Sequence, residues 1–150
     1  DRAARALALS VSHEMHAGFQ ALRQALPMNC RSRRAAGALT QNTAAGALTQ
    51  NTAAGALVEP VAADIARIGA LWADCRRRFG ADGPFLFGRF GIADAMYAPV
   101  VCRFAGYGIA LDEGMAAYRD AILALPAMRR WYADAAAEPW TVARFEDPAG

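Results

Sequence analysis

The chain has 150 residues, of which 55% are hydrophobic and 20% are charged, and its formal net charge is +2 at pH 7. This length suits a single domain with a real core, and the small net charge argues against a nucleic-acid partner. No apolar run is long enough to cross a membrane and no signal peptide is recognisable, so we expect a cytoplasmic protein. The three cysteines lack CxxC spacing and are expected to be reduced: Cys30, Cys75 and Cys102.

The first predicted helix runs from Arg2 to Leu26, and Pro27 ends it. Its apolar residues recur every three or four positions and form one stripe: Leu7, Val11, Met15, Phe19, Leu22 and Leu26. This helix also carries the only two histidines, His13 and His16, which share one helix face. The zincin pattern needs a spacing of four and a nearby third ligand is not evident, so we expect no metal site.

An identical tandem repeat follows the first helix. Residues 35–43 read AAGALTQNT, residues 44–52 repeat them, and residues 53–57 begin a third copy. Solenoid repeats need about 20 residues or more per unit, and a period of nine places successive leucines on opposite helix faces. We interpret residues 35–57 as a duplication, natural or engineered, inserted in the loop between the first two helices. A flexible surface loop is favoured over short helical pieces or an element exchanged between subunits.

The second predicted helix begins near Pro60 and ends at Gly80. Its apolar stripe contains Val61, Ile65, Ile68, Trp72, Cys75 and Phe79. Three consecutive arginines, 76–78, occupy the last turn, where the helix dipole favours cations. This explanation is sufficient for the basic run.

The stretch from Pro84 to Tyr107 contains the strongest helix-start signal in the chain. Gly91 suits an N-cap, and Asp94 lies three residues later, where its carboxylate can accept a hydrogen bond from the Gly91 N–H. The helix that follows is apolar on nearly every side, so it is predicted to lie at the centre of a bundle. Its apolar residues are Ile92, Ala95, Met96, Tyr97, Pro99, Val100, Val101 and Phe104. The internal proline predicts a kink.

Two further helices are predicted on either side of Pro126, which completes an all-α bundle of five helices. The fourth helix has the stripe Leu111, Met115, Tyr118, Ile122 and Leu125. The fifth ends at Pro139 and is expected to direct Met128, Trp131, Tyr132 and Ala135 inward. In the tail, Trp140 and Phe145 are expected to pack over the bundle.

Three segments of the chain resemble the C-terminal domain of glutathione transferases. Residues 84–104, PFLFGRFGIADAMYAPVVCRF, resemble its core helix, with Gly91 in place of the usual Ser or Thr of the capping box. Residues 12–29, SHEMHAGFQALRQALPMN, resemble its first helix in a bacterial branch with a serine-type active site, and residues 117–138 resemble its closing helices. The resemblance covers nearly everything except residues 35–57.

The resemblance implies a two-domain parent enzyme. In that family an N-terminal thioredoxin-like domain binds glutathione and supplies the Tyr, Ser or Cys that stabilises its thiolate, and we expect that domain to be absent from these residues. The helical domain provides a wall for a small hydrophobic electrophile and much of the homodimer interface. Glutathione is therefore expected as a co-substrate of the parent alone, and the present chain is expected to be inactive.

The implied co-substrate wall contains Ser12, Met15, His16, Phe19, Met96, Tyr97, Val100 and Arg103. The apolar members can equally be plain core, whereas the polar members are better candidates, because polar groups among apolar neighbours need partners. Gly91 and Asp94 are assigned as a structural cap. No catalytic residue is expected, because no nucleophile has a base in a recognisable frame and no glycine-rich phosphate loop is present.

Two other readings of the chain stay open. Helical domains of this shape also serve as non-catalytic protein-interaction modules, and the identical repeats would also fit an engineered insertion. A thioredoxin-like pattern ahead of Asp1 would favour the enzyme over the interaction module.

Overall fold

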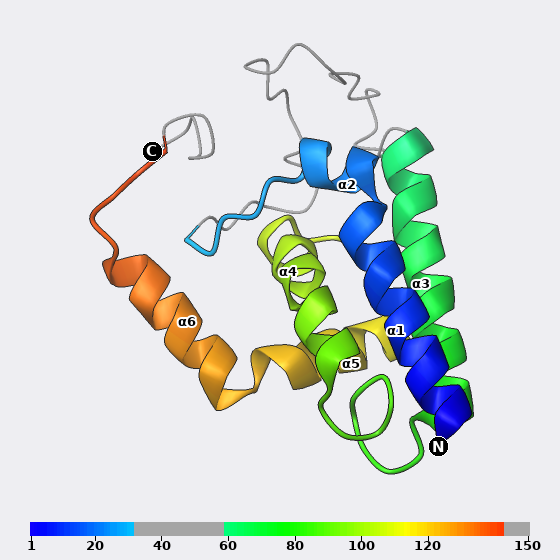
Figure 1. Cartoon of the computed structure of the whole chain (residues 1–150). Coiled ribbons are helices and arrows are strands. Elements are labelled where there is room, and N and C mark those ends of the chain that lie inside the picture. The colour runs from blue at the N-terminus through cyan, green and yellow to red at the C-terminus, as the bar shows by residue number, and fades with distance from the viewer. Residues whose placement is uncertain (32–58, 143–150) are drawn as a thin grey trace.

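The computed structural model describes residues 1–31 and 59–142, in which six helices are present (Figure 1). They are α1 (Arg2–Ala17), α2 (Gln20–Ala25), α3 (Glu59–Phe79), α4 (Ile92–Gly106), α5 (Glu113–Leu123) and α6 (Pro126–Ala137). The all-α class is confirmed. None of the described helices is long and apolar enough to cross a membrane. The tandem repeats and Phe145 lie outside the described residues, so the predictions about them stay predictions.

The prediction of one continuous first helix is wrong, and this accounts for six helices in place of five. α1 ends at Ala17 and α2 begins at Gln20. Between them, Phe19 adopts the left-handed region with φ of 58°, which interrupts the helical backbone. Its side chain is still only 7% exposed, so the apolar stripe continues into the core across the break.

Polar side chains of α2 and α3 stabilise the break between α1 and α2. The Arg23 guanidinium donates hydrogen bonds to the carbonyl oxygens of Met15 (2.6 Å) and His16 (2.7 Å), at the end of α1. The Asp64 carboxylate of α3 accepts a hydrogen bond from the Leu22 N–H of α2 (2.9 Å). Helix ends leave such backbone groups without intrahelical partners, so these bonds offset the cost of dividing the helix. Apolar periodicity carries no information about them.

α4 lies at the centre of the bundle, between α1 and α5 (Figure 1). Its buried apolar residues include Ala93, Tyr97, Ala98, Val100, Val101, Cys102 and Phe104. Two apolar residues of the first turn are exceptions, because Ile92 is 59% exposed and Ala95 is also exposed. The expectation of a central helix is otherwise confirmed. The helix continues through Pro99, and the kink expected there stays a prediction.

Aromatic rings fill the space between α3, α4 and α5. Trp72 lies at the centre of this cluster, with ring centroids 5.7 Å from Tyr97, 5.7 Å from Phe104 and 4.6 Å from Tyr118. All four side chains are at most 1% exposed. Rings at these separations attract each other beyond the area that they bury, so the cluster fixes the three helices together.

The cap predicted at the start of α4 is confirmed and has further contacts. The wholly buried Asp94 carboxylate accepts a hydrogen bond from the Gly91 N–H at 2.8 Å. It also accepts from the Leu86 N–H and from the Tyr118 hydroxyl of α5, each at 3.0 Å. We call Asp94 and these three donors the Asp94 network. It ties α4, α5 and the loop before α4 together around one carboxylate.

The loop between α3 and α4 depends on glycine and on Arg76. Gly88 has a φ of +80°, and a Cβ atom on Gly83 would lie 2.3 Å from the Gly88 carbonyl oxygen. The Arg76 guanidinium donates to the carbonyl oxygens of Pro84 and Phe85, the second at 3.1 Å. The helix dipole therefore does not explain the whole basic run, since one of its arginines also holds the loop that leads to the Asp94 network.

The last helix and the residues after it stand apart from the bundle (Figure 1). We call residues 126–142 the α6 arm. Met128 is the only buried residue of α6, whereas Trp131 is 40% exposed and Trp140 is 78% exposed. The expectation that both tryptophans pack inward is wrong, because α6 packs against α5 only near its start. At the other end, the Arg31 guanidinium donates to the carbonyl oxygens of Glu138 (3.0 Å) and Trp140 (3.1 Å).

Candidate functional site

The eight residues of the predicted co-substrate wall come from α1, the α1–α2 break and α4, which pack side by side. They divide into two groups by exposure. His16 is exposed, and Met96 and Arg103 are half-buried. The other five are at most 7% exposed: Ser12, Met15, Phe19, Tyr97 and Val100. Only the first group reaches the surface of the described domain.

The polar members of the wall find partners within the domain. The Ser12 hydroxyl donates to the Ala8 carbonyl oxygen at 2.7 Å. The Tyr97 hydroxyl donates to the Val11 carbonyl oxygen at 3.3 Å, which links α4 to α1. Burial raises the pKa of the Tyr97 phenol well above its ordinary value, so this group stays protonated and neutral. These two hydroxyls therefore have structural roles in the described domain.

Arg103 joins α4 to the segment after α2. Its guanidinium donates to the carbonyl oxygens of Leu26 and Pro99, both at 2.9 Å. Burial lowers the pKa of Arg103 from its ordinary value, and the positive charge of Arg23 lowers it further. An arginine keeps its charge through such a shift, so Arg103 is a cation at the border between core and surface.

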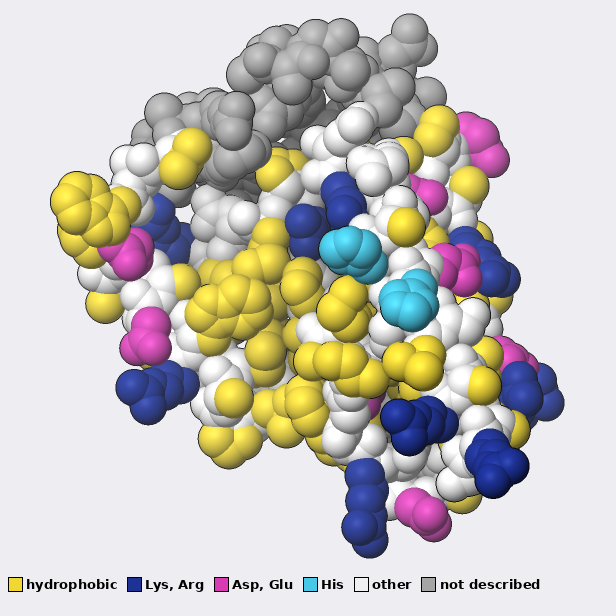
Figure 2. Space-filling model, viewed as in Figure 1, with side chains coloured by type: hydrophobic (Ala, Val, Ile, Leu, Met, Phe, Trp, Pro, Cys, Tyr) yellow, Lys and Arg dark blue, Asp and Glu magenta, His cyan; other side chains and the backbone are white. Residues whose placement is uncertain are grey.

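Both histidine side chains lie on the surface over α1, beside a broad apolar area that extends over α4 toward α6 (Figure 2). Between them in sequence, Glu14 pairs with Arg67 of α3, with distances of 2.7 and 3.0 Å. Within residues 1–31 and 59–142, no three His, Cys, Asp or Glu side chains come together as metal ligands. The face of the domain seen in Figure 2 thus carries an apolar area over α4, with histidine and arginine side chains at its border.

The buried cysteines cannot serve as ready nucleophiles. Cys75 is 1% exposed, and burial raises its pKa to about 11, so it is a protonated thiol at neutral pH. Cys102 is 2% exposed. A thiolate is the form that attacks an electrophile, and neither side chain offers one at an accessible position.

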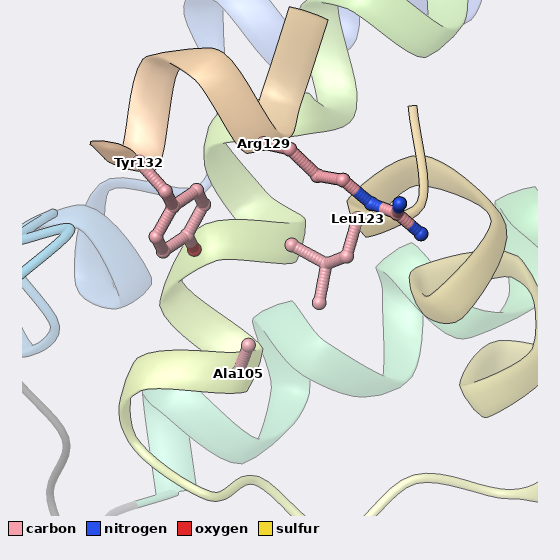
Figure 3. Close-up of a pocket in the computed structure, with 4 residues that line it drawn as sticks. All are labelled: Ala105, Leu123, Arg129 and Tyr132. Carbon is pink, nitrogen blue, oxygen red and sulfur yellow. The ribbon is translucent and has the colours of Figure 1, made fainter. Parts of the chain in front are cut away.

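Three pockets lined by described residues lie along the α6 arm, and none of the predicted wall residues is among their lining residues. One, of about 370 Å³, is lined by Ala105, Leu123, Arg129 and Tyr132 (Figure 3). A second is lined by Cys30, Arg31, Tyr132, Ala133 and Ala136. A third lies between residues 28–31 and the end of the arm, where Trp131, Trp140 and Val142 contribute. Sequence reasoning missed these pockets, since it expected α6 to close against the core.

A protein-family model matches residues 47–134 of the chain, which is more than half of its 150 residues. The description of that family is "Glutathione S-transferase, C-terminal domain". The match contains α3, α4 and α5 and most of α6, and it begins within the stretch that the structure does not describe. No curated protein and no solved structure matches the chain.

Proposed function

The chain belongs to the family of glutathione S-transferase C-terminal domains, and on this basis we propose that it is the helical half of a bacterial, cytoplasmic glutathione transferase. A thioredoxin-like N-terminal domain of the parent protein, of the serine-type branch, would bind glutathione as co-substrate and stabilise its thiolate. The present chain would contribute the wall for a small hydrophobic electrophile and part of a homodimer surface. Its protonated, buried Cys75 is consistent with a nucleophile that comes from the co-substrate.

The observation that carries this proposal is the position of the predicted wall. Its residues come from elements that pack together, and the Tyr97–Val11 hydrogen bond joins α4 to α1 beneath an apolar surface. We assign contact with the electrophile to the surface members, His16, Met96 and Arg103. The five buried members of the wall belong to the core beneath these three residues. An apolar wall of this kind holds an electrophile near the thiolate and keeps water away from it.

The assignment of glutathione binding to the N-terminal domain can be tested by calorimetry with glutathione. The 150-residue chain is expected to give no binding heat, because the family resemblance assigns the groups that bind glutathione to the N-terminal domain. The natural protein, with whatever precedes Asp1, is expected to bind glutathione and to conjugate it to 1-chloro-2,4-dinitrobenzene. If the natural protein neither binds glutathione nor reacts, the transferase proposal is wrong and an interaction module takes its place.

The wall can be tested in the natural protein with two histidine variants. His16→Ala is expected to raise KM for the electrophile roughly fivefold, which corresponds to about 1 kcal/mol of lost contact, and to leave KM for glutathione unchanged. His13→Ala is the matched control, because His13 is also exposed on α1 but is not a wall residue. Equal effects of the two variants would remove His16 from the wall.

A further inference from the structure

The third pocket of the α6 arm brings two exposed tryptophans together with a carboxylate. Trp131, Ala135 and Glu138 follow one another at intervals of four and three residues, so they lie on one face of α6 and its C-cap. All three line a pocket of about 260 Å³, and Trp140, which follows Pro139, lines it with them. Because the Ala135 side chain ends at Cβ, it leaves room on this face between the Trp131 ring and the Glu138 carboxylate.

The walls of this pocket are held in place by contacts of the described residues. The segment after α2 extends toward the arm, and residues 28–31 line the pocket together with it (Figure 1). The Arg31 guanidinium donates to the carbonyl oxygens of Glu138 (3.0 Å) and Trp140 (3.1 Å). These two hydrogen bonds fix the backbone on both sides of Pro139, so they place Glu138 and Trp140 relative to each other.

The Glu138 carboxylate is available to a ligand. Within residues 1–31 and 59–142 no basic side chain pairs with it, whereas Asp134, one turn earlier, pairs with Arg130 at 3.6 Å. The pocket also lies at the C-terminal end of α6, where the helix dipole favours a cation. Among the described lining residues Arg31 is the only cation, and its delocalised charge is partly offset by the two carbonyl oxygens that it bonds.

The two indole rings add a second attraction for a cation. Trp131 is 40% exposed and Trp140 is 78% exposed, so both rings are accessible. The face of an aromatic ring carries negative charge and attracts an ammonium group within about 6 Å of its centre, and tryptophan does so more strongly than tyrosine or phenylalanine. A pocket with two indoles and a carboxylate is therefore complementary to an organic cation.

We propose that this pocket binds a small quaternary ammonium compound of the trimethylammonium type. The cation lies between the two indole rings, and the Glu138 carboxylate balances its charge. Its methyl groups contact Ala135, Met28 and Val142, which line the same pocket. None of the predicted wall residues lines this pocket, so the site is separate from the proposed electrophile wall and does not depend on the transferase proposal.

The test is an NMR titration of the 150-residue chain with choline at constant ionic strength, in which the indole N–H resonances of the three tryptophans are followed. Those of Trp131 and Trp140 are expected to shift and to saturate, with a dissociation constant of about 1–10 mM. Trp72 is 1% exposed and is the internal control, since its resonance is expected to stay in place.

A neutral isostere isolates the contribution of the charge. In 3,3-dimethyl-1-butanol a carbon atom replaces the nitrogen of choline, so the shape is kept and the charge is lost. This alcohol is expected to bind at least about fivefold more weakly than choline. Absence of a saturable shift at Trp131 and Trp140, or equal binding of the neutral alcohol, overturns the proposal.

Variants assign the attraction to individual side chains. Glu138→Gln is expected to weaken choline binding about threefold and to leave binding of the neutral alcohol unchanged. Asp134→Asn is the matched control, because Asp134 is exposed on the same helix but does not line the pocket. Trp140→Leu keeps an apolar side chain without the ring and is expected to weaken choline binding about threefold. All three residues are exposed, so circular dichroism is expected to be unchanged. Equal choline affinity of the Glu138 and Asp134 variants would overturn the assignment of Glu138.

Discussion

α4 and α6 are helices of similar length, 15 and 12 residues, with very different environments. Nine residues of α4 are buried, and its only acidic side chain, Asp94, is the centre of a buried network. α6 buries Met128 alone, and its Arg130–Asp134 pair is on the surface, with side chains 84% and 70% exposed. The comparison teaches that the buried contacts which stabilise the domain gather around α4, whereas the surface beside α6 is left hollowed by pockets.

The two helices also differ in how their ends are held. α4 is fixed at its start by a buried carboxylate that bonds to three donors from the loop before α4 and from α5. The end of α6 is held by Arg31, through two hydrogen bonds in exposed surroundings. A buried charge-assisted bond contributes more than a solvated one, because water competes for the second. The predictions below test this difference.

The largest expected difference comes from two tryptophan substitutions. Trp72→Ala empties the centre of the aromatic cluster and is expected to destabilise the domain by about 4 kcal/mol. Trp140→Ala removes a side chain that is 78% exposed and is expected to change the free energy of unfolding by less than about 0.5 kcal/mol. Urea denaturation of both variants measures this. A cost above about 2 kcal/mol for Trp140→Ala would show that the arm packs on the core.

A second pair of variants compares the two aspartates. Asp94→Ala leaves the Leu86 N–H and the Tyr118 hydroxyl buried without their acceptor, so it is expected to cost about 3 kcal/mol. Asp134→Ala breaks only an exposed pair and is expected to cost less than about 0.5 kcal/mol. Thermal and urea unfolding give both values. A similar loss for the two variants would contradict the central role of the Asp94 network.

Alkaline pH tests the core in another way. The pKa of Cys75 is raised from 9.0 to about 11 by burial. Above pH 9 the unfolded thiol loses its proton while the folded one keeps it, so stability falls between pH 9 and about 11, at on the order of 1 kcal/mol per pH unit. The raised pKa values of Tyr97 and Tyr118 continue the fall above pH 10. Cys75→Val is expected to remove the first part of this loss in urea unfolding at several pH values, and an unchanged profile would contradict it.

The smallest effect is expected at the end of the arm. Arg31→Gln removes the two hydrogen bonds to Glu138 and Trp140, and is expected to lower global stability by less than about 1 kcal/mol. Amides in the last turn of α6 are expected to exchange roughly five times faster, while those of α4 stay unchanged. Hydrogen exchange by NMR measures both, with Arg130→Gln as the control. Faster exchange in α4 would mean that the arm and the core open together.

The sequence predicted most of the fold because the strongest patterns lie in its best packed part. The all-apolar run of α4, the spacing of Gly91 and Asp94 and the stripes of α3 and α5 are all found in the structure. The break at Phe19 was not predictable from periodicity, because the apolar stripe continues across it. Trp131 and Trp140 were misplaced for a similar reason, since hydrophobicity alone does not say whether a surface is present to cover a side chain.

The candidate site was less predictable than the fold. The resemblance selected eight wall residues that lie on α1, α4 and the α1–α2 break, but it could not tell that five of them are buried. Their role in binding stays a prediction. The pocket of Arg129 and Tyr132 had no signal in the sequence, because it exists only through the angle at which α6 leaves α5 and the position of α4 opposite.

The sequence by itself determined the helical class, the central position of α4 and its cap, because these follow from local patterns and from the need to bury an all-apolar helix. The tertiary structure alone decided where the first helix breaks, which of the predicted wall residues reach the surface and how the α6 arm is oriented. Each of these depends on long-range partners: Asp64 for α2, Val11 for the wall residue Tyr97 and Arg31 for the arm. Such partners are far apart in the chain, and folding brings them together.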